Sequence, residues 1–155
     1  MHERWEAARR LLHQNGVTYN IYGDPQGMER PWPLDMIPLL IPADEWDACA
    51  GAANPFVSHA FLSILERSGS ACAQAGWQPL PILVDAADGR AAAIAPAYAK
   101  SHSQGEYVFD HGWADAWERA GGDYYPKLQV AVPFTPVPGP RLLLRDPAAA
   151  APLIA

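Results

Sequence analysis

A group of polar residues directly follows an apolar run in the middle of the chain. The run ends at Ala99, and Lys100, His102, Ser103 and Glu106 come next. Imidazole titrates near neutral pH and a carboxylate can orient it, so His102 and Glu106 are candidates for the base of a proton-transfer reaction. The end of a strand can present such side chains to a ligand, and a solvated loop is the alternative interpretation of the same residues.

A pair of tryptophans offers a second candidate for ligand contact. Trp113 and Trp117 stand four residues apart, which places them on one face of a helix. Such a pair either packs into the core or forms an aromatic platform for a substrate, with Trp113 as the substrate-binding residue. The spacing leaves both interpretations open.

A proline-rich loop supplies a third candidate. Four prolines and a glycine surround Thr135 in residues 133–141, which end at Arg141, and Lys127 precedes the loop. Rigid irregular loops often shape pockets, although a structural connector has the same composition. Lys127 and Arg141 carry the charge that an anionic ligand would need.

The sequence lacks the residues that several other kinds of chemistry require. The glycine-bearing turn over residues 23–27 has neither the Lys nor the Ser/Thr of a phosphate-binding loop, and no serine stands in a nucleophile elbow. Three histidines, His13, His59 and His111, lack metal-ligand spacing, so we expect no metal site. We expect the two cysteines, Cys49 and Cys72, to be small buried hydrophobes.

Composition narrows the function classes further. The 155 residues include 11 Lys plus Arg and 17 Asp plus Glu, a net charge of −6, which argues against a basic nucleic-acid-binding domain. No apolar stretch approaches the roughly 20 residues of a membrane span, and residues 1–10 do not resemble a signal peptide. We therefore expect a cytoplasmic protein. Ten of its 16 prolines lie in residues 25–42 and 126–140, which predicts extended segments there.

The elements that must position these residues are helices and short strands. The clearest signal is a hairpin, in which Asp88 and Gly89 form a tight turn between strands over residues 81–85 and 90–99. The remaining predicted strands cover residues 17–22, 107–109, 128–132 and 141–144. The predicted fold is therefore α/β or α+β.

Helices are predicted from apolar spacing and from caps. Ser58 caps a helix whose apolar face carries Phe61, Leu62 and Leu65, and Asp110 is placed to cap a helix that runs to Arg119. We expect the alanine-rich tail from Asp146 to fray. The other predicted helical segments cover residues 2–15, 43–50 and 70–75, and an extended segment covers residues 30–42.

Three blocks of sequence resemble a known bacterial family. Residues 54–62, 100–110 and 124–136 are similar to GNAT-like, peptidoglycan-biosynthesis-type acyltransferases related to the Fem aminoacyl transferases. The resemblance runs from about residue 46 to residue 155. It implies a partial GNAT-like mixed sheet with flanking helices, holding the first of the modules from which full-length members are built.

The resemblance also implies an activity. Such a module would help to transfer an acyl or aminoacyl group to the amine of a small or peptide-like acceptor, with a base that removes a proton and amides that stabilise the oxyanion. Within this chain, His102 or Glu106 would be the base. Lys100, Lys127 and Arg141 would hold an anionic donor or substrate, with Thr135 orienting it. Ser103 completes this set of substrate-binding candidates.

A second resemblance covers the amino-terminal part of the chain. Residues 11–46 look like the amino-terminal region of circularly permuted ATP-grasp proteins, whose nucleotide and metal ligands would lie outside this stretch. The sequence therefore predicts two parts, an ATP-grasp-like fragment over residues 1–45 and a partial acyltransferase domain over residues 46–155. The junction suggests a fusion or a recombined fragment.

One observation argues against full activity of the chain alone. GNAT proteins hold the donor's pyrophosphate at a glycine-rich loop that leads into a helix, and no such loop is evident in this sequence. Acyl-coenzyme A or an aminoacyl donor is a possible co-substrate, and no cofactor is assigned. The alternatives are a non-catalytic fragment that binds a partner, such as a missing second module or another copy, and the remnant of an ATP-dependent carboxylate-amine ligase.

Overall fold

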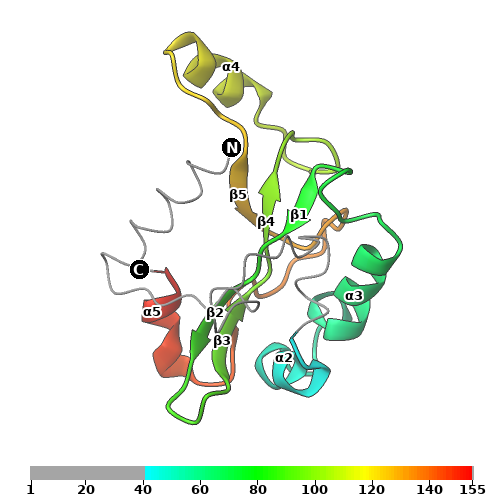
Figure 1. Cartoon of the computed structure of the whole chain (residues 1–155), viewed down its shortest axis with the longest axis vertical. Helices are drawn as coiled ribbons and strands as arrows, with labels where there is room; N and C mark the ends of the chain where they lie inside the picture. The colour runs from blue at the N-terminus through cyan, green and yellow to red at the C-terminus, as the bar shows by residue number, and fades with distance from the viewer. Residues whose placement is uncertain (1–40, 155) are drawn as a thin grey trace, which may run out of the picture.

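The computed structural model of the protein describes residues 41–154. The described residues form two small antiparallel sheets with helices packed around them (Figure 1). The predicted helix over residues 2–15, the strand over 17–22, the turn over 23–27 and the extended segment up to residue 40 lie outside this range. One sheet has the order β1-β4-β5 and the other β2-β3-β6; the strands are β1 (Trp77–Pro79), β2 (Ile82–Asp85), β3 (Ala91–Ala95), β4 (Ala97–Lys100), β5 (Lys127–Val130) and β6 (Leu143–Leu144).

The predicted hairpin is present, and prolines divide it between the two sheets. β2 pairs with β3 next to the Asp88-Gly89 turn, in which Gly89 has a φ of 76°. The same two chain segments continue as β1 and β4 in the other sheet, linked by a hydrogen bond from Leu80 N to Ala97 O at 2.8 Å. Pro96 separates β3 from β4, so the predicted strand over residues 90–99 is two strands.

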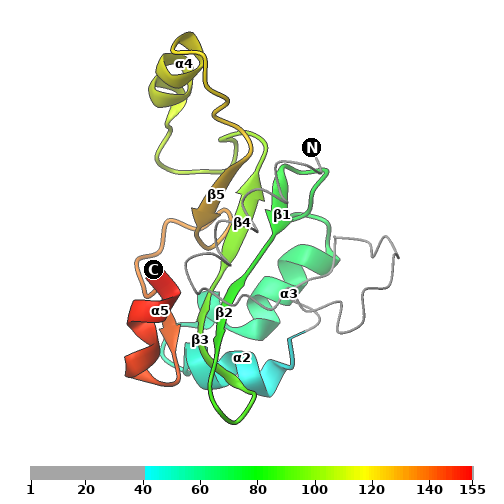
Figure 2. The same ribbon diagram turned by 60° about the vertical axis from the view of Figure 1, so that its left-hand side comes forward.

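Helices cover both faces of the β2-β3-β6 sheet. Helix α2 (Ala43–Ala50) packs against β3 and β6, and α5 (Ala150–Ile154) packs against β2 and β3 (Figures 1 and 2). This arrangement explains the sequence of β3, whose five residues, four of them alanine, are all buried. Small side chains let a helix approach the strand from each side.

Helix α3 (His59–Arg67) packs against α2. Ser58 caps it by accepting a hydrogen bond from Phe61 N, as the sequence predicts, and the helix buries Leu62. A short 3-10 helix, η3 (Pro55–Val57), precedes it, and Val57 O accepts a hydrogen bond from the buried Trp46 indole at 2.8 Å. The helices over residues 43–50 and after Ser58 are thus confirmed.

Helix α4 (His111–Arg119) stands apart from the sheets at one end of the molecule (Figures 1 and 2). Asp110 occupies its N-cap position, but the Asp110 side chain makes no capping hydrogen bond. The expectation of a capped helix is therefore right about the helix and wrong about the cap. The carboxylate of Asp110 instead accepts hydrogen bonds from the side chains of Ser103, Tyr124 and Lys127.

Three local predictions are wrong. Residues 70–75 form turns instead of a helix, with Ala75 N bonded to Cys72 O and Gly76 N to Ala73 O. Residues 107–109 form no strand and are exposed. The tail does not fray, because it forms η4 (Pro147–Ala149) and α5 and buries Ala149 and Leu153 against the sheet.

The predicted α/β class is confirmed as a mixed α/β fold with two small antiparallel sheets and four α-helices among the described residues. The predicted division at residues 45 and 46 stays a prediction. Cys49 is buried, as expected, whereas Cys72 is only partly buried, and both thiols are free. In the described part of the chain, no helix has the length and apolar character needed to cross a membrane.

Candidate functional site

Two lysines stand opposite each other where β4 and β5 pair. Lys100 is the last residue of β4 and Lys127 the first of β5, and the strand register aligns them directly. Like charges at directly opposed positions of an antiparallel pair destabilise the sheet. The two ammonium groups therefore need carboxylates, and the loop between β4 and α4 supplies them.

Lys100 is the more deeply buried of the two lysines. Its side chain is fully buried, with Nζ 3.4 Å from the centre of the Trp77 ring and donating to Gln104 O at 2.9 Å. Burial lowers the pKa of Lys100 to about 8, although the nearby Glu106 carboxylate counteracts this effect. The indole face and one carbonyl thus replace most of the water around this ammonium.

Glu106 lies between the two ammonium groups. Its Oε2 accepts a hydrogen bond from Lys127 Nζ at 2.8 Å, while its Oε1 lies 3.7 Å from Lys100 Nζ and has no hydrogen-bond partner among the described residues. The Glu106 side chain is 5% exposed. Its charge is therefore balanced by the two ammonium groups and not by water.

Asp110 completes the arrangement on the other side of Lys127. Its carboxylate accepts hydrogen bonds from Lys127, from Ser103 and from the Tyr124 hydroxyl, the last at 2.7 Å. Burial alone would raise the pKa of Asp110, but these three donors hold it well below its usual value. Asp110 in turn raises the pKa of Lys127, against the opposing effect of burial.

We refer to Lys100, Glu106, Asp110 and Lys127 as the charge cluster. Ser103 extends it, since its hydroxyl lies 2.7 Å from the Tyr125 hydroxyl and 3.0 Å from Lys127 Nζ. With two lysines and two carboxylates the cluster has almost no net charge when Lys100 is protonated. Its structural effect is to tie the loop after β4 to the start of β5.

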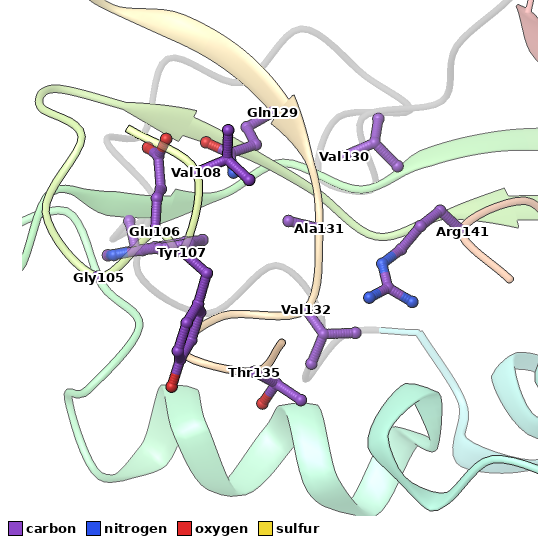
Figure 3. Close-up of a pocket in the computed structure, with 11 residues that line it drawn as sticks. Gly105, Glu106, Tyr107, Val108, Gln129, Val130, Ala131, Val132, Thr135 and Arg141 are labelled. Atoms are coloured by element: carbon purple, nitrogen blue, oxygen red, sulfur yellow. The ribbon is translucent and has the colours of Figure 1, made fainter. Parts of the chain in front are cut away.

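A pocket of about 250 Å³ opens beside the charge cluster (Figure 3). One wall is the loop after β4, a second is β5 and the residues that follow it, and Trp77 and Arg141 also contribute. Glu106 belongs to both the pocket and the cluster. The residues that line the pocket are Trp77, Gly105, Glu106, Tyr107, Val108, Gln129, Val130, Ala131, Val132, Thr135 and Arg141.

The loop wall of the pocket depends on a close packing of Gly105. This glycine has a φ of 78°, and a Cβ atom there would come within 2.5 Å of the Phe134 ring. Phe134 packs against Trp77 with ring centres 5.2 Å apart. The Phe134 ring of the proline-rich loop therefore packs directly on the loop that carries Glu106.

Arg141 brings a positive charge to the opposite side of the pocket from Glu106 (Figure 3). Its guanidinium donates to three backbone carbonyls of the proline-rich loop, those of Val137, Gly139 and Pro140, at 3.0 to 3.2 Å. Within residues 41–154 no carboxylate forms an ion pair with it. The charge is thus held in place by the backbone, and no acidic side chain of the described residues neutralises it.

Gln129 is a further polar residue of the pocket lining. It lies in β5 two residues after Lys127, on the same face of the strand. Its Oε1 is buried and has no hydrogen-bond partner among residues 41–154. The residues that line the pocket thus include one carboxylate, one carboxamide and one guanidinium.

The structure brings four of the predicted site residues together in or beside the charge cluster: Lys100, Ser103, Glu106 and Lys127. Thr135 and Arg141 line the pocket, although the Thr135 hydroxyl donates to Pro133 O. Sequence reasoning misses Asp110 and Gln129 as site residues. The signal for Gln129 is its position two residues after Lys127 in a strand.

His102 and Trp113 lie apart from this group. The His102 ring packs over Gly76, and its Nδ1 accepts from Gln104 N at 3.2 Å, a bond that does not involve the charge cluster. Trp113 is 76% exposed on α4 and Trp117 is 57% exposed, so neither belongs to the core. In the region the structure covers, no three His, Cys, Asp or Glu side chains come together as metal ligands.

Comparisons with known proteins assign the chain to a family. A family model named FemAB-like, described as peptidoglycan biosynthesis/recognition, matches residues 39–154. An uncharacterized protein of Synechocystis sp. is 41% identical over 46 residues, which span 30% of this chain and only 10% of that protein. No solved structure matches the chain. The resemblance of residues 11–46 to ATP-grasp proteins finds no support in these comparisons. Because the family match covers both sheets and the charge cluster, the chain belongs to the FemAB-like family of peptidoglycan biosynthesis/recognition.

Proposed function

We propose that this chain is a module of a peptidoglycan-related transferase that acylates or aminoacylates an amine, and that the pocket beside Glu106 binds the acceptor. The family supports the peptidoglycan-related role. The observation that carries the proposal is that Glu106, whose carboxylate lies between the ammonium groups of Lys100 and Lys127, is the acidic residue among those that line the pocket. An amine bound in the pocket would have this carboxylate as its nearest base.

The charges around Glu106 are already balanced inside the fold. Oε1 lies 3.7 Å from Lys100 Nζ, and Oε2 is bonded to Lys127 Nζ. The two lysines would repel a further positive charge, whereas the Glu106 carboxylate would attract it. An amine must lose its proton before it can attack a carbonyl, and Glu106 is the group proposed to take that proton.

The proposed reaction forms one bond and breaks one. The amine nitrogen attacks the donor's carbonyl carbon, the new C–N bond forms, and the bond between that carbon and the donor's leaving group breaks. The Glu106 carboxylate takes up the proton that the nitrogen loses, then passes it to the leaving group or to water. Glu106 is favoured over His102 for this role because Glu106 is among the residues that line the pocket and His102 is not.

In this proposal Lys100 and Lys127 position Glu106 and do not hold an anionic donor. Both ammonium groups already have partners inside the fold, namely Gln104 O and Trp77 for Lys100 and three side-chain oxygens for Lys127. Arg141 remains the residue of the predicted set that is available to an anion. The involvement of a second module stays a prediction.

Thermal melting tests whether the chain binds the two reactants. The chain is melted alone and with acetyl-coenzyme A, with an aminoacyl-adenylate mimic, with ATP, and with Nα-acetyl-lysine as an amine acceptor. Binding to the native state alone stabilises it by about 2.7 kcal/mol at a ligand concentration of 100 Kd. We expect the acceptor and one of the two acyl donors to raise Tm by several degrees. A cooperative melt that none of these donors and acceptors shifts would contradict the proposal.

A second candidate function is partner binding without catalysis. It is favoured by an exposed apolar surface around α4 and the preceding loop, where Val108 is 84% exposed, Phe109 65% and Trp113 76%. Self-association measured by analytical ultracentrifugation would discriminate the two functions. Association that is lost in Trp113→Ser while acceptor binding is unchanged would assign this surface to a partner.

A further inference from the structure

Helix α4 exposes the apolar face that an amphipathic helix normally buries. Four apolar residues recur at the i, i+3, i+4, i+7 spacing of one helix face: Trp113, Ala116, Trp117 and Ala120. We refer to them as the α4 stripe. All four are exposed, Trp113 by 76% and Trp117 by 57%, whereas the residue that α4 buries is Ala114. The α4 stripe is therefore a contact surface for something outside the described residues.

The α4 stripe is open to a partner and partly fixed in advance. Figures 1 and 2 show α4 at one end of the molecule, apart from both sheets. The Trp117 indole lies so close to Gly122 that a Cβ atom at that glycine would collide with it. An aromatic side chain that is fixed and exposed before binding loses little conformational entropy when a partner arrives.

The α4 stripe is complementary to itself. Two copies of α4 can cross antiparallel about a two-fold axis that passes between Ala116 and Trp117. Trp117 of each copy then meets Ala116 of the other. In the same way Trp113 meets Ala120. Each large side chain faces a small one, which lets the two surfaces interdigitate, whereas a parallel pair would set each tryptophan against its own copy.

Charged residues beside the α4 stripe fit the same arrangement. At about 100° per residue, Asp115 and Arg119 lie on one flank of the stripe. The two-fold axis brings Arg119 of one copy level with Asp115 of the other, and neither residue forms an ion pair within residues 41–154. Exposed ion pairs of this kind contribute little affinity, but they help to fix the orientation of the two copies.

A lipid surface suits α4 less well than a second copy does. Helices that lie on membranes are rich in Lys and Arg on their polar face. The polar face of α4 carries Asp115 and Glu118 besides Arg119, and the whole chain has a net charge of −6. Anionic headgroups would therefore repel this protein.

The exposed apolar area is sufficient for a weak dimer. Phe109 and Val108, 65% and 84% exposed, precede α4 and would lie beside the C-terminal end of the partner helix. With about 200 Å² for a whole aromatic side chain, Phe109 and the two tryptophans of the stripe expose about 400 Å² in each copy, or about 800 Å² in both. Val108 brings the total toward the roughly 1,000 Å² at which specific interfaces begin.

We propose that a second copy of this chain covers the α4 stripe, through antiparallel pairing of the two α4 helices about a two-fold axis. The inference goes beyond the proposed function and does not rest on it, because the transfer reaction is assigned to the pocket beside Glu106. It also goes beyond partner binding in general, since it names the partner and the register.

Sedimentation equilibrium of the whole chain tests the dimer. We expect monomer and dimer in reversible equilibrium with a Kd of about 10 to 100 μM, weaker than interfaces of standard size reach. Ala116→Glu should raise this Kd at least about tenfold, because the two introduced carboxylates meet at the two-fold axis. The control Ala73→Glu, at an exposed turn position, should leave the Kd unchanged. A chain that stays monomeric at about 500 μM, a Kd that Ala116→Glu does not change, or growth beyond the dimer overturns the inference.

Engineered cysteines test the register in a Cys72→Ser background. Position 116 lies next to the two-fold axis, so Ala116→Cys should form a disulfide between copies on mild oxidation. In the matched variant Ala120→Cys the two thiols are offset by about 10 Å along the helices, beyond the reach of a disulfide. Equal cross-linking of the two variants, or cross-linking of Ala120→Cys alone, overturns the antiparallel register. This comparison does not depend on the folding of Ala116→Glu.

A different occupant of the α4 stripe would give a different result. A chain that stays monomeric but sediments with phosphatidylcholine vesicles would assign the stripe to a lipid surface and overturn the dimer. Neither result bears on the proposed function, because acyl transfer by the wild-type chain and by Glu106→Gln reports on the pocket alone.

Discussion

Lys127 donates a hydrogen bond to Glu106 over 2.8 Å and so joins the first residue of β5 to the loop after β4. The same ammonium group also bonds Asp110 and Ser103. One side chain therefore holds the loop that forms a wall of the pocket. The position of Glu106 follows from this link, and the proposed function depends on that position.

Replacing Lys127 by Met should destabilise the protein by about 3 kcal/mol. The substitution keeps the aliphatic stem but leaves the carboxylates of Glu106 and Asp110 without their shared ammonium, and an unpaired buried charge costs several kcal/mol. Urea denaturation measures the change. Arg119→Met, at an exposed position of α4, is the control and should change stability by less than about 0.5 kcal/mol. Equal effects of the two substitutions would contradict the structural role of Lys127.

Asp110 should make the protein sensitive to acid. The pKa of Asp110 in the folded chain lies below its unfolded value of about 3.9, so its stabilising contribution is complete above that pH and is lost as the pH falls toward the folded pKa. Tm measured between about pH 5 and pH 2 should therefore fall more steeply for the wild-type chain than for Asp110→Asn. Parallel curves would show that the hydrogen bonds of Asp110 do not lower its pKa.

Asp88 provides a comparison for the same pH range. Its hydrogen bond from Arg145 lowers the pKa of Asp88 to about 2, so part of the acid dependence belongs to this surface pair. In Asp88→Asn the steep dependence assigned to Asp110 should remain. If Asp88→Asn alone removed all the acid dependence, the prediction for Asp110 would be wrong.

Glu66 should destabilise the protein at neutral pH. Its carboxyl group is buried in α3, neither oxygen has a hydrogen-bond partner within the part of the chain that the structure describes, and burial raises the pKa of Glu66 to about 8. The folded chain then binds a proton that the unfolded chain has lost, so stability falls as the pH rises from about 4 to about 8. Glu66→Gln should remove this decline and raise stability at pH 8 by at least about 1 kcal/mol, as measured by urea denaturation at several pH values. Glu118→Gln, exposed on α4, should do neither.

Gly76 should tolerate no side chain. Its φ is 72°, and a Cβ atom would lie 2.2 Å from His102 Nε2. Gly76→Ala should therefore cost about 3 kcal/mol, from backbone strain and from displacement of the ring. Gly112→Ala is the matched control, since nothing lies within 4 Å of a Cβ there and alanine favours helix α4 by about 0.5 to 1 kcal/mol. Equal melting temperatures of the two variants would refute this packing.

Local signals predict much of the fold. The Asp88-Gly89 turn, the Ser58 cap and the helix after Asp110 all depend on a few neighbouring residues, and the structure contains each of them. The prediction for the tail is wrong because an alanine-rich segment has few apolar side chains of its own. The tail is held by β2 and β3, which lie far from it in sequence.

The charge cluster is predictable only in part. Lys100, Ser103 and Glu106 follow one strand and can be grouped from sequence. Their partner Lys127 depends on the register between β4 and β5, which no local pattern specifies. The position of Asp110 before α4 is typical of a helix cap, and only the approach of Lys127 and Tyr124 shows where its oxygens are used.

The most direct test of the proposed function is a transfer assay that follows the mass of the acceptor. The wild-type chain, Glu106→Gln and the control Glu118→Gln are each incubated with Nα-acetyl-lysine and either acetyl-coenzyme A or alanyl-tRNA. We predict an acylated or alanylated acceptor with the wild-type chain and with Glu118→Gln, and a rate about 100-fold lower with Glu106→Gln, the effect typical of a lost general base. Transfer by Glu106→Gln at the wild-type rate, or no transfer by the wild-type chain from either donor, would contradict the role of Glu106 as the base.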